Sequence, residues 1–269
     1  MAEITAHSPG RFCWADLGTN DLDGAKKLYG ELFNWQFRDV PVGEGMGYTM
    51  ALVRGHEVAG LYRLDEKEKA AGWLPRWQAY ISVANADAAA GRVKELGGKV
   101  IAPPVDVQDA GRMAVVQDPV DAIIALWEPR AHIGARLMGE PGSICWNELL
   151  TRDIDKAASF YMKLFPWEPR TMETGAGPYT IFNFAGVDEA GMMLMPPECG
   201  HEIPCNWLVY FMVEDCDATV AKAEKLSARI MKSPTDIPWV GRFAVLQDTQ
   251  GAVFAVFKPS PRSPAETPQ

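Results

Sequence analysis

The sequence lacks long hydrophobic runs, clusters of basic residues and a signal-peptide pattern at its N-terminus. No window approaches the ~18 consecutive apolar residues of a membrane-spanning helix, and MAEITAHSPGRF contains no apolar core of the kind found in signal peptides. Lys and Arg total 26 against 35 Asp and Glu, a formal net charge of −9, which disfavours a surface that follows nucleic-acid phosphates. We expect a cytoplasmic protein that binds neither a membrane nor a nucleic acid.

Paired cysteines are also missing. The number of cysteines is odd and none forms a CxxC pair, which indicates reduced thiols rather than a disulfide framework; they are Cys13, Cys145, Cys199, Cys205 and Cys216. The chain has 269 residues, of which 48% are hydrophobic and 10% aromatic, ample for one large core or two ordinary ones. The composition therefore predicts a globular protein.

An internal repeat dominates the sequence. Residues 12–35, FCWADLGTNDLDGAKKLYGELFNW, match residues 144–167, ICWNELLTRDIDKAASFYMKLFPW, without a gap. Two further pairs of segments match at a slightly shorter offset, 77–89 with 207–219 and 111–129 with 241–259. The repeat predicts a first domain over residues 8–130, a linker over 131–141, a second domain over 142–260 and a disordered tail over 261–269.

Each half contains a second, shorter cycle of secondary structure. FCWADL alternates like a strand, and the stretch from Asp21 to Leu32 has apolar residues at helical spacing, with Asp21 or Asp23 as the N-cap. Further extended stretches follow, and then the cycle begins again at YISVAN with a helix that Gly97 and Gly98 end. The chain is therefore predicted to be α+β, with four βαβββ modules that form two cupped mixed sheets.

The strand–helix opening and the closing segment GRMAVVQDP (111–119), both repeated in the second half, resemble the vicinal-oxygen-chelate superfamily of glyoxalases, bleomycin-resistance proteins and extradiol dioxygenases. The tandem arrangement is similar to one group within this superfamily, the mycobacterial antigen type. Proteins of that group are described as glyoxalase-like or as hydroxylases. The resemblance implies that two modules pair into one cupped sheet, whose concave face is the binding site. It leaves open whether the modules pair within one chain or across a homodimer.

The resemblance also implies where metal ligands would stand. They fall on Trp14, Gln78 and Ala125 in the first half and on Trp146, Leu208 and Ala255 in the second. A divalent metal needs three or four nitrogen, oxygen or sulfur ligands, and of these six side chains only glutamine could coordinate one. We therefore expect neither a metal nor another cofactor.

Two carboxylates are the candidates for acid–base chemistry. Strand alternation places Asp16 and Glu148 on the same face as Trp14 and Trp146, two residues further along. Burial beside an indole would raise the pKa of a carboxyl group, which suits a general base near neutral pH. The alternative is that each carboxylate only accepts hydrogen bonds from its neighbours, such as Arg112 or Arg242. These two arginines could hold a ligand carboxylate, but we favour a structural contact with Asp118 and Asp248.

Aromatic and flexible apolar side chains at inward positions predict a site for a flat organic molecule. The predicted ligand-binding residues are Trp14, Gln78, Tyr80, Trp127, Trp146, Met193, Leu208, Tyr210 and Phe257. The first interpretation is a metal-independent protein, monomeric or homodimeric, that binds or sequesters an apolar or aromatic metabolite or drug. The alternative is a lyase, isomerase or natural-product tailoring enzyme with Glu148 or Asp16 as base. The second half is the first place to look, because it has the longer carboxylate and more methionines.

Overall fold

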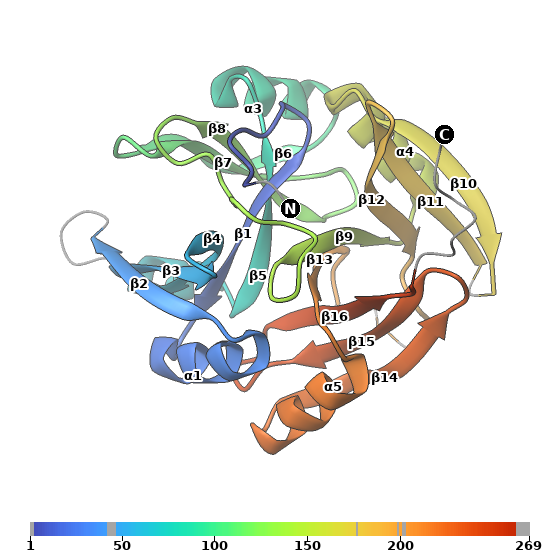
Figure 1. Cartoon of the computed structure of the whole chain (residues 1–269). Coiled ribbons are helices and arrows are strands. Elements are labelled where there is room, and N and C mark those ends of the chain that lie inside the picture. The colour runs from blue at the N-terminus through green and yellow to red at the C-terminus, as the bar shows by residue number, and fades with distance from the viewer. Residues whose placement is uncertain (1–2, 42–46, 176, 198, 201–202, 262–269) are drawn as a thin grey trace.

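The computed structural model describes residues 3–41, 47–175, 177–197, 199–200 and 203–261, so all of the predicted tail except residue 261 lies outside the described residues. Two eight-stranded mixed sheets are present, one from each half of the chain (Figure 1). The strand order in the first sheet is β2-β3-β4-β1-β5-β8-β7-β6, and the second sheet repeats it as β10-β11-β12-β9-β13-β16-β15-β14. The predicted α+β fold with two cupped sheets is confirmed.

The strands and helices follow the predicted cycle. The first half consists of β1 (Phe12–Thr19), α1 (Leu22–Phe33), β2 (Gln36–Pro41), β3 (Gly47–Val53), β4 (His56–Arg63), α2 (Glu66–Ala70), β5 (Arg76–Ser82), α3 (Ala86–Glu95), β6 (Lys99–Val107), β7 (Gly111–Gln117) and β8 (Ile123–Pro129). The second half consists of β9 (Ile144–Thr151), α4 (Ile154–Leu164), β10 (Glu168–Thr174), β11 (Gly177–Phe184), β12 (Val187–Leu194), β13 (Asn206–Met212), α5 (Cys216–Lys225), β14 (Arg229–Ile237), β15 (Gly241–Gln247) and β16 (Val253–Pro259). The short helix α2 is an addition to the βαβββ pattern.

Local sequence explains where the helices begin and end. The side chain of Asp21 accepts a hydrogen bond from the Gly24 amide and starts α1, and Asp153 does the same for α4. Gly97 follows α3 with a φ of +85°, a left-handed conformation that glycine adopts without strain. The repeated capping residues therefore set the same helix start in both halves.

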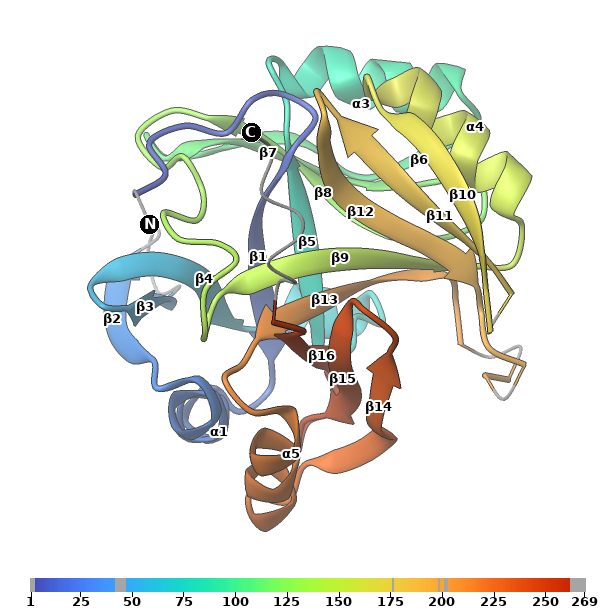
Figure 2. The same ribbon diagram turned by 45° about the vertical axis from the view of Figure 1, so that its right-hand side comes forward.

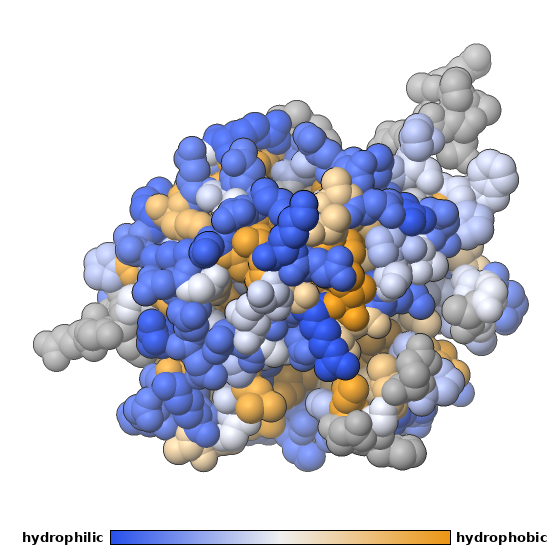
Figure 3. Space-filling model, turned by 90° about the horizontal axis from the view of Figure 1, so that it is seen from below, coloured by the Kyte–Doolittle hydropathy of each residue, from blue (hydrophilic) through white to orange (hydrophobic). Residues whose placement is uncertain are grey.

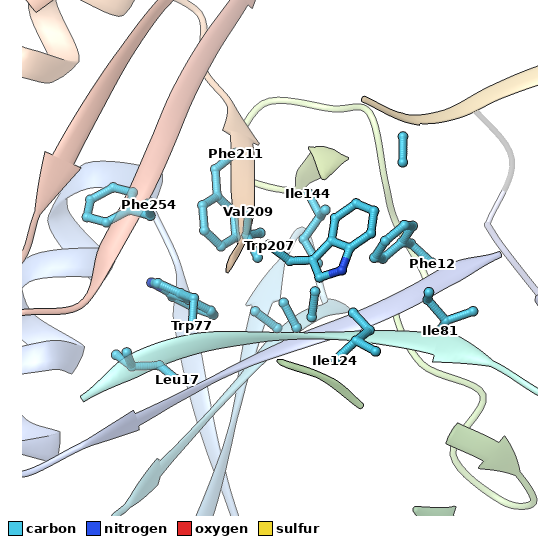
Figure 4. Packing of buried hydrophobic residues seen from close by; sticks show 14 of the residues in the cluster. Phe12, Leu17, Trp77, Ile81, Ile124, Ile144, Trp207, Val209, Phe211 and Phe254 are labelled. Carbon is cyan, nitrogen blue, oxygen red and sulfur yellow. The ribbon is translucent and has the colours of Figure 1, made fainter. Parts of the chain in front are cut away.

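The two halves share one hydrophobic core. Figures 1 and 2 show α3 beside α4 and α1 beside α5, while the central strands of the two sheets cross between them. Figure 4 shows the core at this crossing, where Phe12 of the first half lies 5.0 Å from Trp207 of the second, measured between ring centroids. One face of each sheet is therefore buried against the other half, and the opposite face is left to form the cup.

Reciprocal hydrogen bonds also connect the halves. The Tyr29 hydroxyl donates to Asp248 at 3.0 Å, and the Tyr161 hydroxyl donates to Asp118 at 2.9 Å. The expected contact of Arg112 and Arg242 with these aspartates is therefore wrong, since tyrosines occupy it.

The arginines have a structural role with other partners. Arg112 binds Asp87 through two nitrogens, and Arg242 binds Asp217 in the same way. A bidentate pair of this kind fixes the helix against the sheet beside it. Neither arginine thus reaches the face on which the candidate carboxylates lie.

The outer surface is largely polar. In Figure 3, blue hydrophilic residues cover most of the face seen from below, and orange hydrophobic residues gather between them in small groups. None of the helices in the described part of the chain is long and apolar enough to span a membrane.

Candidate functional site

A buried carboxylate held by two tyrosines forms the floor of the first cup. Asp16 Oδ2 accepts hydrogen bonds from the hydroxyls of Tyr80, at 2.8 Å, and Tyr48, at 3.1 Å. The Tyr48 hydroxyl in turn accepts a hydrogen bond from the indole nitrogen of Trp14 at 2.8 Å. Strands β1, β3 and β5 thus contribute a chain of polar groups that lies among apolar side chains.

The second cup repeats this group with a longer carboxylate. Glu148 Oε2 accepts from the Tyr179 hydroxyl and Oε1 from the Tyr210 hydroxyl, both at 2.9 Å. Trp146 donates its indole N–H to Tyr179 at 3.0 Å. The same hydrogen-bonded group of a carboxylate, two tyrosines and a tryptophan forms with Asp in one half and Glu in the other. Its geometry therefore follows from the strand register rather than from the length of the acidic side chain.

Two residues of this group were missed from the sequence. Tyr48 and Tyr179 lie in strands β3 and β11, and a repeated Tyr-Thr pair at 48–49 and 179–180 was the available signal. Glycines make room for them, since a Cβ atom on Gly60 would collide with the Tyr48 hydroxyl and one on Gly191 with the Tyr179 hydroxyl. A tyrosine and a glycine of the neighbouring strand therefore act together in each cup.

Burial sets the protonation behaviour of the carboxylates. It raises the pKa of Asp16 from 3.8 to about 7, although the hydrogen bonds from Tyr80 and Tyr48 and the charge of Arg76 act in the opposite direction. The pKa of Glu148 is raised for the same reason, against the hydrogen bonds from its two tyrosines. Asp16 Oδ1 is buried and has no hydrogen-bond partner among the described residues. Both groups can therefore take up or release a proton nearer to neutral pH than an exposed carboxyl group.

The predicted lining residues divide between the two cups. A small cluster in the first half brings together Trp14, Tyr80 and Trp127, and one in the second half brings together Leu208, Tyr210 and Phe257, with Trp146 packed against it. Met193 is half-buried and lies beside Leu150 in the register of β12 and β9. Alternation along β12 places it on the same face as Gly191, which lies beside Glu148.

The side chain of Gln78 is not free to bind a ligand or a metal, although its position suggested that it could. It pairs with Asp16 in the register of β1 and β5 and is buried. Its side-chain oxygen accepts from Arg76 at 3.0 Å, and its nitrogen donates to the Ala79 carbonyl at 3.0 Å. Both ends of the amide are thus already bonded within the protein.

The predicted linker closes the first cup. The ring of His132 packs edge-on against Trp14, with the centroids 4.7 Å apart, and also contacts Trp127, whose indole donates to the His132 carbonyl at 2.9 Å. Further along, the Ala135 amide donates to the Cys13 carbonyl at 2.7 Å. Trp14 and Trp127 are consequently only 5% and 6% exposed.

The second cup is more open. Trp146 and Phe257 occupy the positions of Trp14 and Trp127, yet both are only half-buried. Within the described residues no ring packs on Trp146 as His132 packs on Trp14. A cavity of about 400 Å³ reaches Cys145 and Trp146 from the side of the N-terminal segment. The indole of the second half is thus more accessible than that of the first.

The side chains present do not fit a divalent metal. Each cup floor carries one carboxylate, and its hydrogen-bonding neighbours are tyrosine hydroxyls. The positions where the resemblance places metal ligands hold indole, methyl and isobutyl side chains, or the amide of Gln78, which is already hydrogen-bonded at both ends. No group of three or more His, Cys, Asp or Glu residues converges anywhere in the part of the chain that the structure describes. Any chemistry in the cups must therefore be argued from the carboxylate and tyrosines themselves.

Comparison with known proteins gives consistent matches over both halves. The family model of the glyoxalase/bleomycin resistance protein/dioxygenase superfamily matches residues 11–126 and 132–256. The protein named "Putative glyoxylase CFP32" from Mycobacterium bovis is 43% identical over 263 residues, covering 97% of this chain and all of the relative. The anthracycline biosynthesis protein DauV from a Streptomyces species is 35% identical over 265 residues, covering 94% of each.

Among solved structures, the Mn(II)-bound glyoxalase from Novosphingobium aromaticivorans superposes with a TM-score of 0.62 at 15% identity, covering 93% of this chain and 82% of that one. At this identity the similarity shows the fold alone. The fold and the sequence relatives thus agree, and the chemistry has to come from the residues in the cups.

Proposed function

The chain belongs to the glyoxalase/bleomycin resistance protein/dioxygenase superfamily, and from that premise we propose that its second cup binds a flat, mostly apolar aromatic small molecule. One observation carries the proposal: the same carboxylate–tyrosine group is buried in both cups, but only in the second are the aromatic walls, Trp146 and Phe257, partly exposed. We also infer that residues 8–130 and 142–260 are two domains, since each contains one complete sheet.

The chemistry of the second cup suits such a ligand. An aromatic ring stacked on Trp146 gains both apolar burial and the specific geometry of paired aromatic systems. Glu148 and its two tyrosines supply the few polar groups that orient a ligand in a mostly apolar pocket. The likeness to an anthracycline biosynthesis protein supports a polycyclic aromatic ligand.

A second candidate function rests on the pKa of Glu148. Burial raises it, so the carboxylate can act as a general base near neutral pH. The corresponding enzyme would be a lyase, isomerase or tailoring enzyme that removes a proton from its aromatic substrate. Tyr179 and Tyr210 would stabilise the charged form of Glu148 before it accepts the proton.

The test uses a hydroxylated anthraquinone as the probe and matched changes in the two cups. Trp146→Leu removes the exposed wall and should weaken binding about tenfold or more, measured by calorimetry. Glu148→Gln should change the affinity by only a few fold if the protein binds without catalysis. Asp16→Asn, the same change of charge in the closed cup, should leave the affinity unaltered.

Mass spectrometry of the probe separates binding from catalysis. If the probe is converted, general-base catalysis requires Glu148→Gln to slow the conversion roughly 100-fold or more. An unchanged affinity in Trp146→Leu, or an equal loss in Asp16→Asn, would show that the second cup is not the binding site.

A further inference from the structure

The cavity that reaches Cys145 and Trp146 lies between the halves and adjoins the second cup, with which it shares Trp146. Its volume is about 400 Å³, within the range of small-molecule pockets. The N-terminal segment from Ile4 to Phe12 forms one side, the linker at Met138 and Gly139 another, and the beginnings of β9 and β12 the floor. Both halves therefore contribute to it.

An unpartnered polar group points to a ligand here. Asn147 lines the cavity and is only 3% exposed, and its Oδ1 atom is buried with no hydrogen-bond partner among the described residues. Leaving a buried acceptor unbonded is unfavourable, because the group has given up its hydrogen bonds to water. A group that donates a hydrogen bond to this oxygen would recover that free energy.

The internal repeat provides a control for this interpretation. Asn147 occupies the position of Ala15 in the first half, and its neighbour Glu189 occupies that of Val58. Ala15 and Val58 are completely buried in the shared core. The same fold therefore packs well with two apolar residues at these positions, so packing alone does not require the polar pair.

Two other polar side chains of the cavity, Glu189 and His7, are already bonded. Glu189 accepts from the Phe12 amide at 2.6 Å and from Arg11 at 2.9 Å. His7 Nε2 lies 2.8 Å from the Ala135 carbonyl, to which it must donate because a carbonyl only accepts. Glu189 thus ties the halves together, and the Asn147 oxygen remains as the open acceptor.

We propose that this cavity binds a neutral phenol-like molecule whose hydroxyl donates to Asn147 Oδ1. The charges of Arg11 and Glu189 neutralise each other, so the cavity does not favour a charged ligand. Cys145, Trp146 and Met138 supply half-buried apolar surface for the ring. The site shares Trp146 with the second cup, but Glu148 does not line it.

The test is an NMR titration of the full chain with phenol and with anisole, whose methoxy group cannot donate a hydrogen bond. We expect phenol to bind several-fold more tightly than anisole. Asn147→Ala, which copies Ala15, should lower the affinity for phenol about tenfold and leave that for anisole unchanged. Glu148→Gln should leave both unchanged, because Glu148 does not line this cavity.

A second variant tests the same site if Asn147→Ala does not fold. Ser8 is exposed at the edge of the cavity, so Ser8→Trp should block phenol without disturbing the core. Equal binding of phenol and anisole, phenol binding that survives both variants, or a crystal structure of the phenol-soaked protein with only water on Asn147 Oδ1 would overturn the proposal.

Discussion

Replacing Asp16 by Asn should make the chain more stable at pH 8 than the wild type, although it alters a residue at the centre of the first cup. The folded chain holds the Asp16 proton up to about pH 7, whereas the unfolded chain releases it near pH 3.8. The stabilisation of the neutral acid is therefore complete below pH 3.8 and is lost as the pH rises through 7. Asparagine has no charge to desolvate, and its oxygen can still accept from Tyr48 and Tyr80.

The magnitude follows from the shift of roughly three pH units. One proton contributes about 1.4 kcal/mol per pH unit, and Asp16 is half ionised in the folded chain near pH 7, so the unfolding free energy of the wild type should fall relative to Asp16→Asn by about 2 kcal/mol between pH 5 and 7. Above about pH 8 the difference should be constant. Urea unfolding followed by circular dichroism at half-unit pH steps measures the slope.

An exposed carboxylate provides the control. Asp109 lies in the turn before β7, and Asp109→Asn changes the net charge by the same amount as Asp16→Asn. If the difference between wild type and Asp16→Asn is independent of pH from 5 to 8, or matches that of Asp109→Asn, then Asp16 does not have a raised pKa and the argument from burial fails.

Two further changes test the packing between the halves and the design of a helix. Tyr161→Phe removes the hydroxyl that donates to Asp118 and accepts from Trp207, and should lower the unfolding free energy measured in urea by roughly 2 kcal/mol. Tyr29→Phe is the matching change in the first half and should have a similar effect. A large loss of stability in only one of the two variants would contradict the reciprocal pairing. Gly91→Ala places a methyl group in open space on the exposed side of α3 and should raise the unfolding free energy by about 0.5–1 kcal/mol; a decrease in the thermal midpoint would refute it.

The sequence was sufficient for the fold because the repeat and the local signals agree. Gapless matching of residues 12–35 with 144–167 set the same strand and the same capped helix in each half. Strand alternation then placed Asp16 with Tyr80, and Glu148 with Tyr210, on one face, because side chains alternate with a period of two along a regular strand.

Contacts between distant strands could not be predicted in this way. Tyr48 and Tyr179 reach the carboxylates only because β4 and β12 lie between β3 or β11 and the first strand of each half, and because Gly60 and Gly191 leave room for the tyrosine hydroxyls. The arginine contacts were predicted wrongly for a related reason. Asp118 and Asp248 are partners of tyrosines from the other half, which no pattern within one half indicates.

The sequence by itself thus determined the two sheets, their modules and the parity of the cup residues, since these depend on local propensity and on the repeat. Only the tertiary structure decided that the cups are unequal. The linker residue His132 covers Trp14, while Trp146 stays partly exposed and Asn147 faces a cavity between the halves. Two homologous strands acquire different surroundings because packing depends on which distant segment lies against each of them.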